Sequence, residues 1–333
     1  MTQQQDAPDV SVVMSVYNGE EHLEKAIRSI LNQTFSDFEF VIVNDGSTDA
    51  TRTIVERLAE NDTRIVLINQ SNTGLTQALC NGVAAARAPL IARMDADDIS
   101  APDRLARQVH VLASRPDCVA VTCHIEHFFD DGTIRSTATH IGPEPLIPLY
   151  NVFSNRIGGH GQVMFRKSDY EAVGGYDPAF RYSQDYDLWA RLLDRGSFAV
   201  VEEVLYRWRV GHGSITDKNK SAQLDCALQI SMREFEKLTG EPLLKATAQA
   251  LIDFWWARKP ENTPMIETIR ASRAMDRAIT CFFEKNPELQ PMKAQVRRDI
   301  ASNWRWRIPL AGRLNLVRRA LLLGHHLYWR RIN

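Results

Sequence analysis

The sequence predicts an α/β fold in which a mostly parallel central sheet is flanked by helices and followed by a helical C-terminal extension. In the first 95 residues, four apolar runs alternate with three segments of helical periodicity. This alternation is typical of βαβ units on a parallel sheet. The apolar runs are continuous, as expected for strands that are buried on both faces. From about Ser221 the pattern becomes helical to the end.

The elements can be placed in order along the chain. Strands are expected at residues 10–16, 38–43, 65–68 and 90–94, and helices at 20–31, from Thr48 or Asp49 to about 59, and at 75–86. After Asp103 the alternation weakens. A helix is expected at 104–114, a strand at 119–129, a glycine-rich approach to a strand at 158–165, a helix at 186–193 and a strand at 198–208.

Composition and charge place the chain among soluble globular proteins. It has 333 residues, 44% of them hydrophobic and 24% charged, which suits one large domain or two smaller ones. The net charge is -1, but residues 293–333 contain ten Lys or Arg and one acidic residue. An odd number of cysteines without metal-type pairing fits a reducing cytoplasm. The polar segment 1–9 is expected to be a flexible tail without a signal peptide, and no apolar stretch is long enough for a transmembrane helix.

Polar loops follow each of the four predicted parallel strands. They are Ser15-Val16-Tyr17-Asn18, Asn44-Asp45-Gly46-Ser47, residues 69–74 and Asp95-Ala96-Asp97-Asp98. Ligands of such sheets bind at the carboxyl ends of the strands. One polar loop is ordinary turn chemistry, but four that converge on one edge favour a nucleotide-sized pocket.

The tetrapeptide 95–98 is the most informative of these loops. Three carboxylates at the exit of one strand repel each other unless water or a cation neutralises them. Mg²⁺ commonly binds through one or two carboxylates together with substrate phosphates. A solvated acidic turn before the next helix is the alternative, since Asp is favoured at helix N-termini.

Over residues 10–216 these motifs and their order resemble the family 2 glycosyltransferases, which have the GT-A fold. Further matching segments are Asn72-Thr73-Gly74, Gly174-Gly175-Tyr176-Asp177, Gln184-Asp185-Tyr186-Asp187-Leu188-Trp189 and Tyr206-Arg207-Trp208-Arg209. The resemblance implies a catalytic domain at 10–216, with a nucleotide-sugar half at 10–99 and an acceptor half at 100–216. The helical region 217–333 is not explained by this shared core. Where the family commonly has Glu, this chain has Gln184.

The resemblance also implies roles for single residues. Asp97 would bind a divalent metal, Mn²⁺ or Mg²⁺, and Asp95 would face the ribose or a metal-bound water, while Asp98 would ligate weakly or cap the next helix. Asp45 would accept a hydrogen bond from the pyrimidine N3-H. The expected nucleotide-sugar residues are Ser15, Val16, Tyr17, Asn18, Glu20, Asp45, Asn72, Gly74, Arg93, Asp95 and Ala96. Two of these leave an alternative open: Glu20 could belong to a helix N-terminus, and Arg93 could pair with a nearby carboxylate.

On the acceptor side, Asp185 is expected to be the general base that takes the proton of the attacking hydroxyl. Asp187 is a rival, although residues two apart on a helix do not share a face. His212 is a candidate metal ligand, and Arg207 or Arg209 a candidate phosphate contact. Acceptor contacts are expected from His160, Gln184 and Trp189, the last of which could also be a core residue.

The basic C-terminal segment, from Pro309 on, has the pattern of an amphipathic helix with arginines on one side and leucines on the other. Such a helix can lie on an anionic membrane surface, or its leucines can pack on the catalytic domain. No nucleic-acid-binding motif accompanies the charge. We therefore expect a cytoplasmic enzyme, peripheral on the inner membrane.

The resemblance implies an inverting, metal-dependent glycosyltransferase of surface-polysaccharide assembly, including lipopolysaccharide, O-antigen or exopolysaccharide. It would transfer a sugar from a UDP- or dTDP-sugar to a saccharide or lipid-linked acceptor. The alternatives are a sugar nucleotidyltransferase and a catalytically silent nucleotide-sugar-binding module.

Overall fold

A computed structural model of the chain describes residues 7–138, 142–211, 219–255 and 263–310, the last eight of them by backbone alone. The chain forms two compact units. The first comprises residues 1–147 and 156–223, and the second residues 148–155 and 224–333. The sequence analysis divided the chain near residue 217 and did not detect that residues 148–155 belong with the helical unit.

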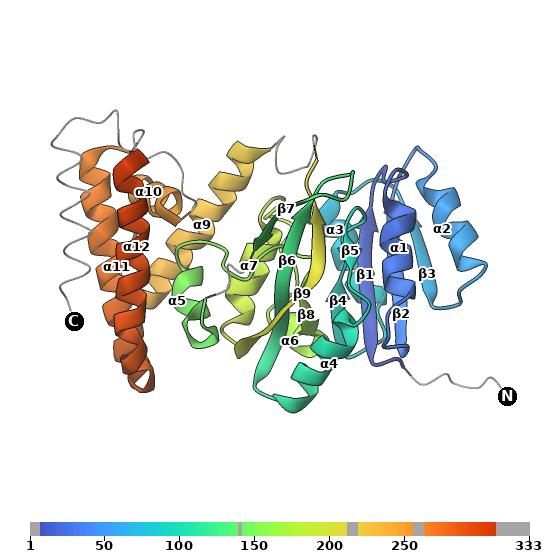
Figure 1. Cartoon of the computed structure of the whole chain (residues 1–333), viewed down its shortest axis with the longest axis horizontal. Coiled ribbons are helices and arrows are strands. Elements are labelled where there is room, and N and C mark those ends of the chain that lie inside the picture. Colours follow the sequence, from blue (N-terminus) through green and yellow to red (C-terminus); the bar gives the residue numbers. More distant parts are fainter. Residues whose placement is uncertain (1–6, 139–141, 212–218, 256–262, 311–333) are drawn as a thin grey trace. The chain divides into compact units, whose positions relative to one another are not determined.

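The first unit is built on one sheet with the strand order β3-β2-β1-β4-β8-β6-β9-β5, and β7 pairs with β6 (Figure 1). Its N-terminal strands β1 to β4 are parallel neighbours, as the continuous apolar runs predicted. The elements of this half are β1 (Val10–Val16), α1 (Leu23–Leu31), β2 (Phe38–Asp45), α2 (Thr51–Ala59), β3 (Ile65–Gln70), α3 (Leu75–Ala85) and β4 (Leu90–Arg93).

The other half of this sheet mixes strand directions. Strands β6 and β9 are parallel to each other, whereas β8 runs antiparallel to β4 and β6, and β5 antiparallel to β9. The elements are β5 (Ile99–Ser100), α4 (Arg104–Ser114), β6 (Cys118–Phe128), β7 (Ile134–Ala138), η1 (Glu144–Leu146), α5 (Ile147–Asn151), β8 (Met164–Arg166), α6 (Lys167–Ala172), α7 (Gln184–Leu192) and β9 (Ser197–Arg209). The short strands β5 and β7 were not predicted, because neither is long enough to show a period.

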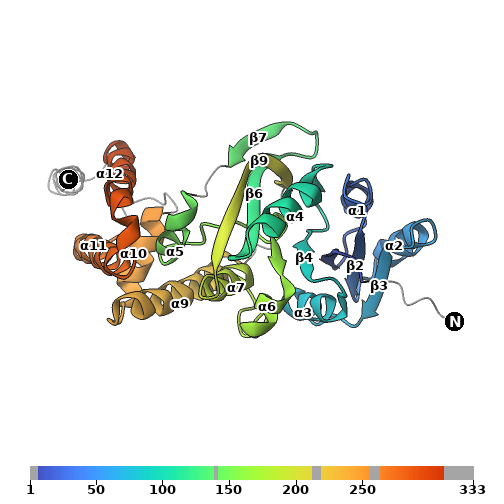
Figure 2. The ribbon, with the colours of Figure 1, turned by 90° about the horizontal axis from the view of Figure 1, so that it is seen from below.

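Helices cover both faces of the sheet (Figure 2). One core cluster joins side chains of α1, α2 and α4 to alternate residues of β1, such as Val12 and Met14. The other joins α3, α6 and α7 to the intervening residue Val13 and to β8. Since successive strand residues point to opposite faces, β1 must be apolar at nearly every position, which explains the unbroken run seen in the sequence. The predicted α/β class is confirmed.

The second unit is helical. It contains most of α9 (Lys220–Thr239), then α10 (Lys245–Trp255), α11 (Met265–Lys285), η3 (Pro287–Met292) and α12 (Lys293–Leu310). Buried apolar residues of α10 and α11, including Leu251 and Met275, form its interior. Within the described ranges, no helix is long and apolar enough to cross a membrane. The predicted basic helix lies, except for its first two residues, outside the described residues.

Candidate functional site

The loops that follow β1 and β2 are bound to each other by hydrogen bonds from main-chain N–H groups to side-chain oxygens. The Asn18 side-chain oxygen accepts the Thr48 N–H at 2.8 Å, and the Glu20 carboxylate accepts the Ala50 N–H at 2.8 Å. Asn18 has a φ of 50°, a left-handed conformation that Asn tolerates better than most residues. Glu20 therefore caps the start of the neighbouring helix α2, while the exposed Tyr17 beside it has 54% of its surface open to solvent.

The loop after β3 is held by Asp45. One carboxylate oxygen accepts the Thr73 N–H at 2.8 Å and the other accepts the Gly74 N–H at 2.9 Å. The Gln70 side chain donates to the first oxygen as well, at 2.8 Å. The second oxygen accepts only the Gly74 bond among the described contacts, and an ionised carboxylate offers about four lone-pair sites. Asp45 can therefore anchor this loop and still accept one further donor.

The acidic tetrapeptide separates into side chains with different partners. Arg93 is 1% exposed, and its guanidinium donates to the Asp95 carboxylate at 2.8 Å. Arg93 thus makes the predicted pair with a nearby carboxylate, and its contact with a phosphate or the sugar stays a prediction. Asp98 is 1% exposed and accepts the Tyr206 hydroxyl at 2.8 Å and the Arg209 N–H at 2.7 Å. The predicted cap of the next helix by Asp98 is wrong, because both its oxygens are bound to β9.

The end of β9 therefore fixes the acidic loop. The Tyr206 hydroxyl donates to Asp98 and accepts the Asp95 N–H at 3.2 Å, so one phenol oxygen bridges two residues of the motif. Arg209 Nε donates to the Asp97 carbonyl at 2.7 Å. A Cβ added at Gly161 would lie 1.8 Å from the Tyr206 hydroxyl, so only glycine fits beside it.

Arg207 and Arg209 are not among the residues that line the cavity described below. Arg207 pairs with Glu126 at 3.3 Å, and Arg209 with Asp130 at 2.7 Å. Both guanidinium groups also lie over the Phe128 ring. The structure therefore gives each arginine a carboxylate partner, and the predicted phosphate contact stays a prediction.

A cavity of about 410 Å³ opens beside the acidic loop, within the first unit. It is lined by Gly74, Leu75, Asp95, Asp97, Asp98, Gly159, His160, Gly161, Gln162, Arg181, Tyr182, Ser183, Gln184, Asp185, Tyr206, Trp208, Asn219 and Gln223. The predicted residues Gly74, Asp95, Asp97, His160, Gln184 and Asp185 thus share one cavity. The other predicted nucleotide-sugar residues include those at the ends of β1 and β2 and Asn72. They lie at or in the neighbouring loops.

Asp185 lies in the first turn of α7, and its carboxylate accepts the Tyr186 N–H at 2.8 Å. Burial raises the pKa of Asp185 to about 6, and the negative charge of Asp95 contributes to the rise. Ser183, immediately before this helix, has a φ of 56°. A left-handed residue other than glycine stores backbone strain, which is found preferentially at functional sites. A carboxylate with a pKa near neutrality suits a general base.

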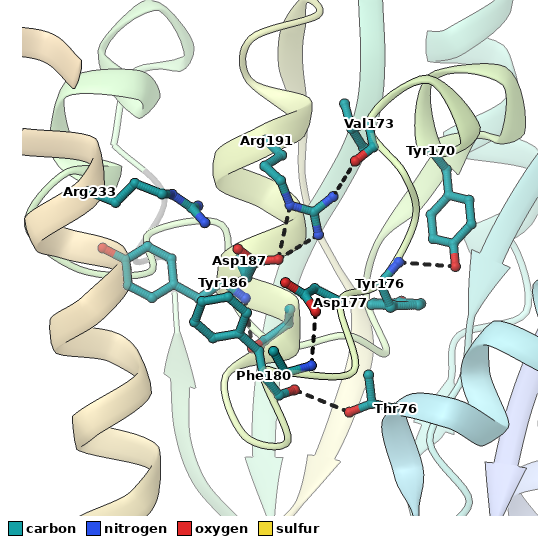
Figure 3. A network of polar contacts seen from close by, with 12 residues as sticks. Thr76, Tyr170, Val173, Tyr176, Asp177, Phe180, Tyr186, Asp187, Arg191 and Arg233 are labelled. Carbon is teal, nitrogen blue, oxygen red and sulfur yellow. Dashed lines mark hydrogen bonds and ion pairs between the residues drawn. The ribbon is translucent and has the colours of Figure 1, made fainter.

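Asp187 has a structural role. It is fully buried and accepts two hydrogen bonds from the Arg191 guanidinium, which also donates to the Val173 carbonyl at 2.7 Å (Figure 3). The turn 174–177 is held nearby, because the Tyr176 N–H donates to the Tyr170 hydroxyl at 3.2 Å. A Cβ at Gly175 would lie 2.8 Å from the Tyr170 ring. The Asp187 carboxylate is therefore paired with Arg191, and Asp187 is not among the residues that line the cavity.

His160 lies at the cavity wall over a cluster of aromatic side chains. Its ring is 5.4 Å from Tyr176 and 6.1 Å from Trp189. Trp189 is fully buried, and its indole N–H donates to the Gly158 carbonyl at 3.3 Å. Sequence analysis gave Trp189 two possible roles, an acceptor contact or a core residue, and the burial fits the core residue. Burial, together with the charge of Arg93, lowers the pKa of His160 well below its usual value. The imidazole is therefore neutral, and its Nε2 has no hydrogen-bond partner among the described residues.

The donor set of the cavity fits a hard cation that is shared with substrate phosphates. Partial burial, and then the negative charge of Asp95, raise the pKa of Asp97, so a positive charge between these carboxylates would relieve their repulsion. Two carboxylates are a common protein contribution to an Mg²⁺ site. In the described part of the chain, no group of three or more His, Cys, Asp or Glu side chains is arranged to hold a metal by itself. His212, the predicted third ligand, lies outside the described residues.

The sequence analysis did not assign functions to several cavity residues, among them Tyr206, Trp208, Gln162 and Arg181. The sequence did contain one indication that two of these residues lie together. In a strand, residues two apart share a face, and this rule groups Tyr206 with Trp208. The contact of Gln162 with the cavity depends on the return of β8 beside β4, which no local pattern encodes.

Comparison with known proteins agrees with this geometry. Residues 11–174 match the family model described as Glycosyl transferase family 2. The O-antigen biosynthesis glycosyltransferase WbnJ of Escherichia coli is 32% identical over 235 residues, which cover 68% of this chain and 89% of WbnJ. The crystal structure of S. aureus TarS 1-349 in complex with UDP-GlcNAc has a TM-score of 0.59 at 14% identity, covering 97% of this chain and 90% of that one. The mannosyltransferase PcManGT from Pyrobaculum calidifontis, in complex with GDP-Man and Mn2+, has a TM-score of 0.55 at 17% identity, covering 97% and 87%. At these identities the two structures show a common fold.

Proposed function

The chain belongs to the family 2 glycosyltransferases, and from that membership we propose that it is an inverting, metal-dependent enzyme. In this proposal it transfers a sugar from a UDP- or dTDP-sugar to a hydroxyl of a saccharide or lipid-linked acceptor. One observation carries the proposal: the side chains of Asp97 and Asp185 line the same cavity, although 88 positions separate them in the chain. In this proposal one of the two acids holds the cation and the other acts as the base at the same cavity.

The reaction can be written on these residues. The acceptor hydroxyl oxygen attacks the anomeric carbon while its proton passes to the Asp185 carboxylate. The bond between the anomeric carbon and the diphosphate oxygen breaks on the opposite side, so the configuration inverts and the nucleoside diphosphate leaves with the bonding electron pair. A base of this kind contributes about 10² to 10⁴ in rate. Asp185 is suited to this step because burial brings its pKa to about 6, so that it is ionised at neutral pH but still a stronger base than an exposed Asp.

A divalent cation held by Asp97, with Asp95 facing the ribose or a metal-bound water, would stabilise the charge that develops on the departing diphosphate. The protein keeps these two acids in place through β9. The hydrogen bonds of Tyr206 to Asp98 and to the Asp95 N–H fix the loop before any ligand binds. Preorganised groups need little rearrangement in the transition state, so the rigid attachment supports catalysis.

On the donor side, the spare lone pairs of Asp45 and the exposed ring of Tyr17 are our candidates for binding the pyrimidine base. Ser15, Val16, Asn18, Glu20, Asn72, Gly74 and Ala96 would form the rest of the nucleotide site. The UDP-GlcNAc complex of TarS supports a uridine nucleotide. The Mn2+ complex of PcManGT supports a metal-dependent reaction.

We place the reaction in surface-polysaccharide assembly, as the O-antigen role in the name of WbnJ supports. The basic segment 309–333 would bring the enzyme to the cytoplasmic face of an anionic membrane, where lipid-linked acceptors are present. Charge of this kind contributes about 1 kcal/mol per basic residue near such a surface.

A nucleotide-sugar screen tests the proposal. UDP- and dTDP-sugars are ranked by thermal stabilisation of the full chain with and without Mn²⁺, and those that bind are assayed for release of nucleoside diphosphate. Asp185→Asn should keep binding and lose turnover by about 10² to 10⁴. Glu202→Gln, which changes an exposed carboxylate of β9 outside the cavity, is the matched control and should keep both.

Other results would favour the alternatives. Formation of a nucleotide sugar from a nucleoside triphosphate and a sugar phosphate would indicate a nucleotidyltransferase. Tight binding of a nucleotide sugar without turnover by the wild type would indicate a silent binding module. Equal turnover by wild type and Asp185→Asn would remove Asp185 from the role of base.

A further inference from the structure

Trp208 places a large aromatic ring in the cavity. It is 41% exposed and follows Tyr206 by two positions on β9, so both side chains are on the cavity face of the strand. The side chains of Arg207 and Arg209 lie on the other face, over Phe128. The direction of Trp208 is therefore set by the pleat of a long, paired strand and does not depend on a mobile loop.

A row of side chains extends from Trp208 across the sheet. In the pairing of β6 with β9, Trp208 is opposite His127, and in the pairing of β6 with β7, His127 is opposite Ser136. The His127 and Trp208 rings are 5.1 Å apart at an angle of 45°. The Ser136 hydroxyl is 3.0 Å from His127 Nδ1, which holds the imidazole in place. The indole is thus backed by a fixed ring, and 41% of the Trp208 surface is open to solvent.

The position of this row within the sheet indicates what it faces. The nucleotide loops follow β1, β2 and β3 at one end of the strand order, whereas β9 lies near the other end, beyond β8 and β6. Asp97 and Asp185 line the same cavity as Trp208. A ring on the far side of the acidic loop from the nucleotide loops is placed for the molecule that receives the sugar.

We propose that Trp208, supported by His127, is the stacking platform for a pyranose ring of the acceptor. In this proposal the acceptor of the enzyme is a saccharide, and the stacked pyranose is next to the reacting hydroxyl. This inference rests on the proposed function. A pyranose has one face of C–H groups and a rim of hydroxyls. Trp offers a large, rigid apolar surface that would be covered by that face, while Gln184 and the neutral His160 are available at the cavity wall for the hydroxyls.

The indole of Trp208 can report binding directly. The chain contains seven tryptophans, so the indole N–H resonances of the ¹⁵N-labelled full chain can be assigned with the single variant Trp208→Phe. The labelled protein is titrated with methyl pyranosides of common hexoses, N-acetylhexosamines and deoxyhexoses in the presence of UDP and Mn²⁺. We expect at least one pyranoside to shift the Trp208 signal while the buried Trp189 signal stays in place.

Kinetics supply the second measurement. With the pyranoside that binds as acceptor, Trp208→Ala should raise KM about tenfold, the upper range of an aromatic contact, and should impair transfer to the saccharide more than release of nucleoside diphosphate to water. Phe129→Ala, which removes an equally exposed aromatic ring outside the cavity, is the matched control and should change neither.

The inference is overturned if no pyranoside moves the Trp208 signal, or if the nucleotide sugar alone moves it. It is also overturned if Trp208→Ala slows transfer to the saccharide and transfer to water equally, since the ring would then serve the donor. If the wild type neither binds nor cleaves any nucleotide sugar, the proposed function fails, whereas the pyranoside titration still reports on Trp208 by itself.

Discussion

The substitution Asp185→Asn should make the protein more stable while it slows transfer by about 10² to 10⁴. In the folded state burial raises the pKa of Asp185 from an ordinary 3.8 to about 6. The ionised form is therefore less favourable in the folded than in the unfolded chain. The cost of ionising Asp185 is absent below the unfolded pKa, grows as the pH rises between the two values, and is constant above the folded pKa. Asn carries no charge and is isosteric, and its side-chain oxygen can still accept the Tyr186 N–H.

The size of the effect follows from the shift. One pKa unit corresponds to about 1.4 kcal/mol, so a shift from 3.8 to about 6 corresponds to about 3 kcal/mol at pH values well above the folded pKa. At about pH 4.5, where the folded carboxyl is mostly protonated, the same linkage gives a destabilisation of the folded state of about 1 kcal/mol. Asp185→Asn should therefore exceed the wild type in free energy of unfolding by more at about pH 8 than at about pH 4.5, with a difference of about 2 kcal/mol.

Urea unfolding at the two pH values, with a chelator to remove metal ions, measures this difference. Glu202→Gln, at an exposed position, should show no such pH-dependent gain. The pH dependence of transfer by the wild type gives an independent value, because the rate should rise with pH through about 6 as Asp185 ionises. An Asn variant whose stability difference from the wild type does not change with pH, or a wild-type rate that is flat from pH 5 to about 8, would refute the assignment of a raised pKa to this residue.

Three further outcomes follow from the structure. Asp97→Asn should remove the additional thermal stabilisation that Mn²⁺ gives in the presence of UDP, and an unchanged shift in melting temperature would exclude Asp97 as a ligand. Tyr206→Phe should lower the free energy of unfolding by about 1–3 kcal/mol, because it leaves an oxygen of the buried Asp98 without its donor; a value near zero in urea unfolding would contradict the bridging role. Asp187→Asn should destabilise the fold by about 3 kcal/mol or more, because it leaves the Arg191 charge unpaired. The folded fraction of that variant should still transfer sugar, and a stable but inactive protein would return Asp187 to the list of candidate bases.

The parallel half of the fold could be predicted from local patterns. The strands from Val10, Phe38, Ile65 and Leu90 begin where the apolar runs begin. A strand that is buried on both faces needs an apolar side chain at nearly every position, and that requirement is visible without a partner. The polar loops at the strand ends could be assigned to one edge, because parallel strands bring their carboxyl ends together.

The starts of the first helices were less predictable. The helix expected from Glu20 begins at Leu23, since the Glu20 N–H and carboxylate are bound to Asp49 and Ala50 across the loop. Such contacts join residues about 30 positions apart. Helix periodicity and capping preferences describe only neighbouring residues. They could not have shown that the Glu20 N–H and carboxylate are hydrogen-bonded to a distant loop.

The sequence by itself determined the fold class and the family, because these depend on residue types in a fixed order, and the same motifs led to the prediction that Asp97 and Asp185 act in the reaction. The tertiary structure alone decided how equivalent carboxylates are used. Asp187 is neutralised by Arg191 and Asp98 is bound by β9, whereas Asp185 is left half-buried at a cavity. The physical reason is that the pKa and the reach of a carboxylate depend on burial and on partners from distant strands and helices, which become neighbours only when the sheet is assembled.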